Sequence, residues 1–268
     1  MEIAAISLKA GRTILGYFRS DVSVDRKNDA SPVTDADRHG EDIITSGLAQ
    51  AFPEIPILAE EAASTGSFPA LGLDAEGPFF LVDPLDGTKE FISGSGEFTV
   101  NIALVRKGAP VQGVVVAPAL GAIYLGIAGA GAWRAEAPKC VAGDWEPIMT
   151  RRPAPTELIA VGSRSHGSDA TEVFLARLPI ADFLKAGSSL KFCRIAEGAA
   201  DVYPRFGRTM EWDTGAGQAV LQAAGGTVLE ASSWSPLSYG KAARGYDNPF
   251  FVAWGDPERA ASAGDACS

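Results

Sequence analysis

Apolar residues recur every three or four positions at the start of the chain. The spacing from Ile3 to Phe18 predicts an amphipathic helix over residues 2–18. A second helix is expected to begin near Asp37 and to end near Phe52, again with one apolar face. Both helices are therefore expected to be amphipathic.

Short apolar runs elsewhere in the chain predict strands, because they are bounded by turn residues and are too short for helices. The expected strands cover residues 57–59, 79–82, 98–105, 111–117, 122–128, 158–161, 227–230 and 250–254. Further helices are expected over 169–178, from 187–189 to about 195, and over 214–224. The change in pattern predicts an α+β first half, residues 1–150, and an α/β second half, residues 151–268, packed as one unit.

Two of the expected strands end at carboxylates. Glu60 follows the run 57–59, and the run 79–82 leads into Asp83-Pro84-Leu85-Asp86-Gly87-Thr88. Pro84 lacks a backbone donor, which predicts that the strand ends there and the chain turns. Carboxylates at strand ends would lie where open α/β sheets bind ligands. Close carboxylates repel each other unless a cation such as Mg²⁺ lies between them. A plain Asp-Gly turn and a solvated Glu60-Glu61 loop remain the alternatives.

Small or polar residues at helix starts suggest anion-binding sites in addition to the metal site. Gly87-Thr88, Gly187-Ser188-Ser189 and the helix start at Asp213 would each present backbone N–H groups without partners. The same residue types are also common helix caps, and Thr34 with Asp37 matches a capping box. Four acids at element ends beside such anion sites suggest metal-assisted phosphoryl chemistry.

Composition narrows the classes of function. The chain has 268 residues and a formal net charge of −10, which argues against nucleic acid as a partner. Its three cysteines are widely separated and fit neither a disulfide framework nor a zinc spacing, which favours a reducing compartment. Glu2, Lys9 and Arg12 do not fit a signal peptide, and no run approaches the roughly 20 apolar residues of a membrane span. We expect a cytoplasmic protein without a transmembrane segment.

The acidic motif, in this setting, resembles a known family. Residues 83–88, Glu60 upstream and residues 212–217 downstream are similar to the signatures of the inositol monophosphatase superfamily of Mg²⁺-dependent, lithium-sensitive phosphatases. From about residue 5 to residue 254 the chain most resembles the bacterial 3′(2′),5′-bisphosphate nucleotidases of that superfamily. That closer resemblance rests on residues 31–34, 88–92, 96–101, 163–166, 187–193 and 203–207. It implies a layered αβαβα sandwich of the inositol monophosphatase and sugar phosphatase type.

The resemblance also implies a site, residue by residue. Glu60, Asp83 and the Leu85 carbonyl would hold one Mg²⁺, while Asp83, Asp86 and Asp213 would hold a second. A third, weaker ion would join through waters near Glu60. Asp37 and Thr88 match the pair that polarises the attacking water; the alternative for Asp37 is capping alone. The implied substrate contacts are Glu60, Leu85, Asp86, Gly87, Thr88, Ser163, His166, Gly187, Ser188, Lys191, Arg205 and Asp213.

Arg205 gives the clearest indication of the substrate. Inositol monophosphatases tend to have an acid near this position, whereas Arg205 with Arg208 close by suits a second phosphate. Lys191 and Lys27 would add positive charge. We therefore expect hydrolysis of the 3′-phosphate of adenosine 3′,5′-bisphosphate, or of its sulfated form, which would clear a by-product of sulfur assimilation. His166 would lie against the ribose or base, or be an ordinary surface or core histidine.

Two departures and two alternatives accompany this expectation. Ala59 stands where the nucleotidases often have Ser, and Glu211 adds an acid that would crowd the metal site and tune its affinity. One alternative function is an inositol or sugar monophosphatase. The other is a non-catalytic metal- or nucleotide-binding regulator on the same fold, which the intact set of acids disfavours.

Overall fold

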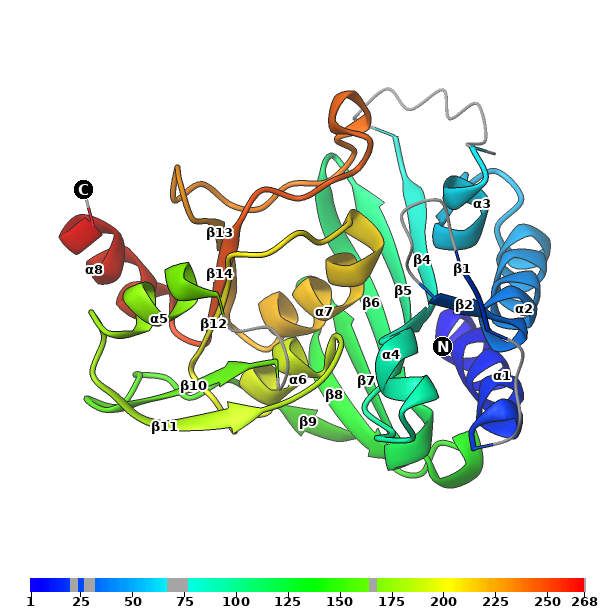
Figure 1. Cartoon of the computed structure of the whole chain (residues 1–268), viewed down its shortest axis with the longest axis horizontal. Helices are drawn as coiled ribbons and strands as arrows, with labels where there is room; N and C mark the ends of the chain where they lie inside the picture. The colour runs from blue at the N-terminus through cyan, green and yellow to red at the C-terminus, as the bar shows by residue number, and fades with distance from the viewer. Residues whose placement is uncertain (20–23, 27–31, 67–76, 164–167, 268) are drawn as a thin grey trace.

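The protein is a stack of five layers. The computed structural model describes residues 1–19, 24–26, 32–66, 77–163 and 168–267 (Figure 1). Helices α1 (Glu2–Tyr17) and α2 (Asp35–Ala51) cover one face of a seven-stranded sheet, and α6 (Leu190–Ala196) and α7 (Glu211–Ala223) cover the other. A five-stranded sheet follows, and α5 (Asp169–Leu175) and α8 (Pro257–Cys267) lie on its outer side. The expected layered αβαβα fold is confirmed.

The seven-stranded sheet contains the strands from the first part of the chain, in sequential order. Its first pair is parallel and every later pair is antiparallel. The strands are β3 (Ile57–Ala59), β4 (Phe79–Asp86), β5 (Thr99–Arg106), β6 (Ala109–Ala117), β7 (Ala122–Ile127), β8 (Gly131–Glu136) and β9 (Glu146–Ile148).

The five-stranded sheet has the order β11-β10-β12-β14-β13. The first three strands are parallel, and the last two pairs are antiparallel. The strands are β10 (Leu158–Gly162), β11 (Ile180–Lys185), β12 (Val202–Arg205), β13 (Thr227–Glu230) and β14 (Phe251–Trp254). Smaller elements are β1 (Val24–Arg26), β2 (Pro32–Thr34), α3 (Glu60–Ser64), α4 (Thr88–Ile92) and the short 3₁₀ turns η1 (Pro118–Leu120), η2 (Pro138–Cys140) and η3 (Ala242–Arg244).

Helix α7 connects the two sheets. It belongs to the second half of the chain, yet it packs directly on β6 and β7 of the seven-stranded sheet. The contact is so close that a Cβ at Gly113 would lie 2.4 Å from the Ala216 carbonyl oxygen, and one at Gly126 would lie 2.5 Å from the Cα of Val220. Glycine at these strand positions therefore allows the helix to approach the sheet. This packing brings the start of α7, with Asp213, towards the end of β4.

Several expectations from the sequence need correction. Strand β4 does not end at Asp83: an irregularity in the ladder spans Pro84, and pairing resumes between Asp86 and Thr99. A proline in such a bulge needs no ladder hydrogen bond. Glu60 and Glu61, for which a solvated loop was the alternative, lie instead in the first turn of the short helix α3. The apolar pattern also did not predict β9, β11 or α8. The division of the chain near residue 150 stays a prediction.

Candidate active site: a buried carboxylate cluster

The register between β3 and β4, the first two strands of the seven-stranded sheet, brings Glu60 and Asp83 together. Strands β3 and β4 run parallel, and Ala59 pairs with Val82. The next residue on each strand is the acid, so Glu60 and Asp83 lie side by side at the same edge of the sheet. Asp83 is only 1% exposed. The two acids therefore lie together as expected, but only Glu60 follows the end of its strand, because β4 continues past Asp83 to Asp86.

The bulge in β4 shapes the second part of the cluster. The Leu85 N–H donates to Asp83 Oδ1 at 3.0 Å, which closes a tight turn around Pro84. Asn101 of β5 pairs with Asp83 in the ladder, and its Nδ2 donates to Asp86 Oδ2 at 3.4 Å. Both the tight turn and the acid cluster are therefore present. The bulge turns Asp86 towards the same edge of the sheet as Asp83.

Asp213 joins the cluster from the start of α7. Its Oδ2 accepts a hydrogen bond of 2.8 Å from the Met210 N–H, as in a helix cap. Its backbone carbonyl accepts one of 2.8 Å from the Ser189 hydroxyl, which ties α7 to the start of α6. Capping and proximity to the other acids coexist, so the two interpretations of Asp213 are compatible.

Glu211 does not crowd this cluster, and the expectation that it would is wrong. It is fully buried, and its carboxylate accepts 2.8 Å hydrogen bonds from the Gly240 and Lys241 N–H groups. The Lys241 ammonium lies 2.9 Å from the same carboxylate. The role of Glu211 is therefore to fasten the segment after β13 to the start of α7.

The electrostatics of the cluster are those of acids without a cation. Burial raises the pKa of Asp83 well above its usual value, and repulsion from Glu60, Asp86 and Asp213 raises it further. Burial also raises the pKa of Asp213 well above its usual value, with repulsion from Asp86 and Glu60 in the same direction. The pKa of Asp86 rises to about 6, mainly through burial, although Lys191 opposes the shift.

A divalent cation would relieve this repulsion. In the described part of the chain, no lysine or arginine forms an ion pair with Asp83, Asp86 or Asp213. Across those same residues, no three His, Cys, Asp or Glu side chains are arranged as a finished ligand set. The donors are carboxylate and carbonyl oxygens, the set that a hard ion takes, and Mg²⁺ commonly completes such a set with water. The chemistry of the donors therefore fits Mg²⁺.

Asp37 and Thr88 form a second feature at the edge of the cluster. Asp37 Oδ2 accepts 2.7 Å hydrogen bonds from both the N–H and the hydroxyl of Thr34, which confirms the capping box at the start of α2. Asp37 Oδ1 remains for the Thr88 hydroxyl, which lies 3.2 Å away and also 3.3 Å from the Leu85 carbonyl oxygen. Each carboxylate oxygen of Asp37 thus has its own partner, so capping and a catalytic role do not compete.

Cationic side chains face the acids across a cavity of about 170 Å³. Lys191, Arg205, Asp86 and Asp213 line it, together with Glu90. Burial lowers the pKa of Lys191 to about 8, against the attraction of Asp86, and Arg205 lowers it further. The Lys191 ammonium also lies 5.4 Å from the centre of the Tyr203 ring. A small anionic group can therefore contact both the acid cluster, through a cation, and these two basic side chains.

Ser188 and Gly187 connect the two halves of the chain at this cavity. The Ser188 hydroxyl lies 2.8 Å from the Asp86 carbonyl oxygen and 2.9 Å from that of Glu97, and it can donate to either. A Cβ at Gly187 would lie 2.6 Å from the Glu97 carbonyl oxygen, so glycine is required by this close approach. Substrate binding by these residues stays a prediction, because the Ser188 hydroxyl already has protein acceptors.

Sequence reasoning missed two residues of the site, Glu90 and Asn101. The hairpin register places Asn101 opposite Asp83, so pairing of the two apolar runs could have found it. Glu90 lies one helical turn after Gly87 in α4 and reaches the same cavity. His166 and Lys27 lie outside the described residues. Ser163 lines both the first cavity and a neighbouring cavity of about 390 Å³, and the two cavities also share Tyr203 and Arg205.

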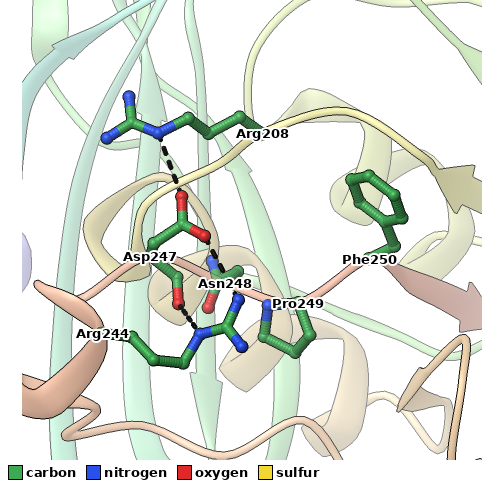
Figure 2. A pocket seen from close by; sticks show the side chains of 6 residues that line it. All are labelled: Arg208, Arg244, Asp247, Asn248, Pro249 and Phe250. Carbon is green, nitrogen blue, oxygen red and sulfur yellow. Dashed lines mark hydrogen bonds and ion pairs between the residues drawn. The ribbon is translucent and has the colours of Figure 1, made fainter.

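A third, more open pocket lies beyond Arg208 (Figure 2), with a volume of about 730 Å³. Asp247 binds two arginines there: its Oδ1 lies 3.0 Å from Arg208 Nε and its Oδ2 lies 3.3 Å from Arg244 Nη2. Arg208 is thus held by Asp247, which weakens it as a partner for a second phosphate. Arg205 is the better candidate.

Comparisons with known proteins agree with this geometry. The model of the inositol monophosphatase family matches residues 1–252. The chain is 42% identical over 230 residues to the 3′(2′),5′-bisphosphate nucleotidase CysQ of Salmonella typhimurium, covering 85% of this chain and 88% of that protein. It is 40% identical over 241 residues to CysQ of Escherichia coli K12, covering 89% and 92%.

Solved structures give the same result. The crystal structure of CysQ from Bacteroides thetaiotaomicron aligns with a TM-score of 0.78 and 38% identity, covering 95% of this chain and 96% of that one. An inositol monophosphatase from Anabaena aligns with a TM-score of 0.71 and 26% identity, covering 98% and 93%. The family match over most of the chain, the acid cluster and the five-layer fold lead to one conclusion: this chain belongs to the inositol monophosphatase family.

Proposed function

We propose that this protein is a Mg²⁺-dependent 3′(2′),5′-bisphosphate nucleotidase. It removes the 3′-phosphate of adenosine 3′,5′-bisphosphate to give AMP and phosphate, and it acts on the sulfated form in the same way. The observation that carries this proposal is the carboxylate cluster facing Lys191 and Arg205 across a small cavity. The relatives named CysQ support the choice of a nucleotide substrate. A place in sulfur assimilation and in the cytoplasm follows, and the buried free thiols of Cys140 and Cys193 suit a reducing compartment.

The metal ligands in this proposal are those already in the cluster. Glu60, Asp83 and the Leu85 carbonyl would hold one Mg²⁺, Asp83 with Asp86 and Asp213 a second, and waters near Glu60 a third, weaker ion. Bound Mg²⁺ supplies a more acidic water and neutralises charge on the phosphoryl oxygens. Lithium sensitivity would follow from the same ligand set.

Thr88 and Asp37 accept the proton of the attacking water. When the Thr88 hydroxyl donates to Asp37 Oδ1, 3.2 Å away, a lone pair on its oxygen is free to accept a hydrogen bond from water. The proton can then move from water to Thr88 and from Thr88 to Asp37. The two Thr34 donors hold the other Asp37 oxygen and so fix the orientation of the carboxylate. Backbone N–H groups of Gly87 and Thr88 would bind the phosphate that leaves.

Arg205 and Lys191 favour a bisphosphate. An arginine can bind a phosphate with two parallel hydrogen bonds, which a neutral sugar hydroxyl cannot match. In the described structure, Arg205 Nε is buried without a hydrogen-bond partner. That donor is available to a second phosphate, which makes Arg205 the residue that separates a nucleotidase from an inositol monophosphatase.

The test is phosphate release from adenosine 3′,5′-bisphosphate and from inositol 1-phosphate, each with Mg²⁺ and with a chelator. The proposal predicts a strong preference for the bisphosphate and loss of activity on chelation. Arg205→Ala should raise KM for the bisphosphate about tenfold or more and leave inositol 1-phosphate turnover unchanged. A preference for inositol 1-phosphate would make this chain an inositol or sugar monophosphatase instead. Release from neither substrate would favour a non-catalytic regulator.

A further inference from the structure

The cavity next to the acid cluster has an aromatic wall that the proposed phosphate chemistry does not use. Phe183 lies on β11, the edge strand of the five-stranded sheet, and its side chain is 41% exposed. It lines the cavity of about 390 Å³, which also contains Tyr203 and Arg205 of the neighbouring phosphate cavity. Because this apolar ring is partly exposed and lines a cavity, it can contact a ligand bound there.

The ring of Phe183 lies over the backbone of β10. Strands β10 and β11 are parallel neighbours, and a Cβ at Gly162 would lie 2.6 Å from the Cζ atom of the Phe183 ring. Glycine at position 162 therefore leaves room for the ring to lie across the strand end. Among the described aromatic residues, none makes a ring contact with Phe183. One side of the ring is thus available to a planar group.

Other residues that line this cavity suit the same kind of ligand. Phe206, which follows β12, lines it and is itself packed on Phe174 at a ring distance of 5.5 Å. Ser168 and Thr171, whose hydroxyl oxygens lie 3.0 Å apart, add polar atoms at the start of α5. An aromatic wall with a polar rim is the usual form of a site for a heteroaromatic ring.

We propose that Phe183 is the stacking platform for the nucleobase of the substrate and selects nucleotides over base-free phosphates. This inference rests on the proposed nucleotidase function, since it places the 3′-phosphate at the acid cluster and the base in the adjoining cavity. Arg205 lies between the two cavities and contacts the phosphate on the 5′ side. Phe183 acts on binding and takes no part in the chemical step.

The experiment compares two substrates in the wild type and three variants. One substrate is adenosine 3′,5′-bisphosphate, and the other is 1,4-anhydroribitol 3,5-bisphosphate, which keeps both phosphates and lacks the base. Phe183→Ala should raise KM for the nucleotide about tenfold with kcat within twofold, and should leave KM for the base-free analogue unchanged. Phe183→Trp should keep the nucleotide KM close to that of the wild type. Leu120→Ala removes another exposed apolar side chain, one that lines neither cavity, and should change neither KM.

Two results would overturn the proposal. If Phe183→Ala leaves the KM for the nucleotide unchanged, Phe183 does not stack on the base. If the KM rises equally for both substrates, Phe183 has a structural role and does not recognise the base. Calorimetric binding of AMP separates this inference from the proposed activity. A wild type that binds AMP through Phe183 but releases no phosphate refutes the activity alone. Phosphate release with AMP binding that is unaffected by Phe183→Ala refutes the platform alone, and a wild type that does neither refutes both.

Discussion

Among the described residues, some buried carboxylates are paired with a cationic side chain and backbone donors, whereas the acids of the cluster lie close to one another. Asp201, far from the cluster, is ion-paired with Arg151, whose Nε donates at 3.0 Å, and it accepts a 2.7 Å hydrogen bond from the Ile159 N–H. Glu211 has two backbone donors and Lys241. Asp83 is as deeply buried and Asp213 is partly buried, yet the charges nearest to them are mainly other acids.

The difference separates the acids that have a structural role from the acids that are suited to bind a metal ion. A buried carboxylate is tolerated when donors and a cation satisfy it, and it is strongly disfavoured as an anion otherwise. The paired acids therefore stabilise the fold as it stands. Asp83, Asp86 and Asp213 have raised pKa values instead, which a metal ion bound among them would offset.

The largest expected contrast comes from matched acid-to-amide substitutions in the two settings. Asp83→Asn removes the ligand that both proposed metal positions would share, so activity should fall on the order of 10³-fold while the metal-free protein stays folded. Asp201→Asn should instead lower the free energy of unfolding by about 2 kcal/mol, because Arg151 loses its charged partner. Phosphate release and urea unfolding measure the two effects. Retained activity in Asp83→Asn would show that the site is assigned wrongly.

Thr88 tests the proton path that borders the cluster. Thr88→Ala should reduce kcat about 100-fold, because the water loses its link to Asp37, while Thr88→Ser keeps the hydroxyl and most of the activity. Steady-state kinetics at saturating Mg²⁺ measure both variants. Equal loss in the serine and alanine variants would mean that packing of the threonine methyl group matters, and not the hydroxyl.

The dependence of stability on pH separates the two settings without any mutation. Asp86 has a folded pKa of about 6, above its usual value of 3.8, so the folded metal-free protein binds this proton more tightly than the unfolded chain does. The contribution of this group to stability is therefore lost as pH rises from about 4 to about 6. Mg²⁺ should raise the unfolding temperature by roughly 3 °C or more at pH 7.5 and by less at pH 5. Thermal unfolding with and without chelator checks this, and an equal Mg²⁺ effect at both pH values would contradict it.

Ser188 provides the smallest of these effects. Its hydroxyl ties the Asp86 and Glu97 carbonyls to the second half of the chain, although its backbone φ of 50° disfavours a side chain. Ser188→Ala should cost about 1 kcal/mol of unfolding free energy and raise the Mg²⁺ concentration needed for half-maximal activity. Ser188→Gly removes the same bond but relieves the backbone strain, so it should cost less. A more stable Ser188→Ala protein would rule out the proposed link.

The sequence was informative where the chemistry follows a local pattern. Glu60 and Asp83 each follow an apolar run, and Thr34 with Asp37 has the spacing of a capping box, so the order of residues along the chain is enough to predict these positions. Asp213 could be predicted for the same reason, as an acid at a helix start. The family resemblance then supplied their roles.

The remaining features depend on contacts between distant parts of the chain. The contacts of Glu211 with Gly240 and Lys241 span about thirty residues, so no local pattern shows that this acid points away from the cluster. Pro84 is tolerated because it lies in a bulge, and the pairing of Asp86 with Thr99 that continues the strand beyond it cannot be predicted from the local sequence. Strand β11 is largely exposed, so Phe183 has no apolar periodicity that would reveal its strand.

The central claim is that the acids of the carboxylate cluster form a metal site, and equilibrium dialysis tests it most directly. Chelator-treated protein is dialysed against increasing Mg²⁺ at pH 7.5, and bound metal is measured by atomic emission for the wild type and for Asp83→Asn. The account predicts saturable binding of two Mg²⁺ ions per chain in the wild type, with both strongly weakened in the variant. Absence of saturable binding, or equal binding by both proteins, would contradict it.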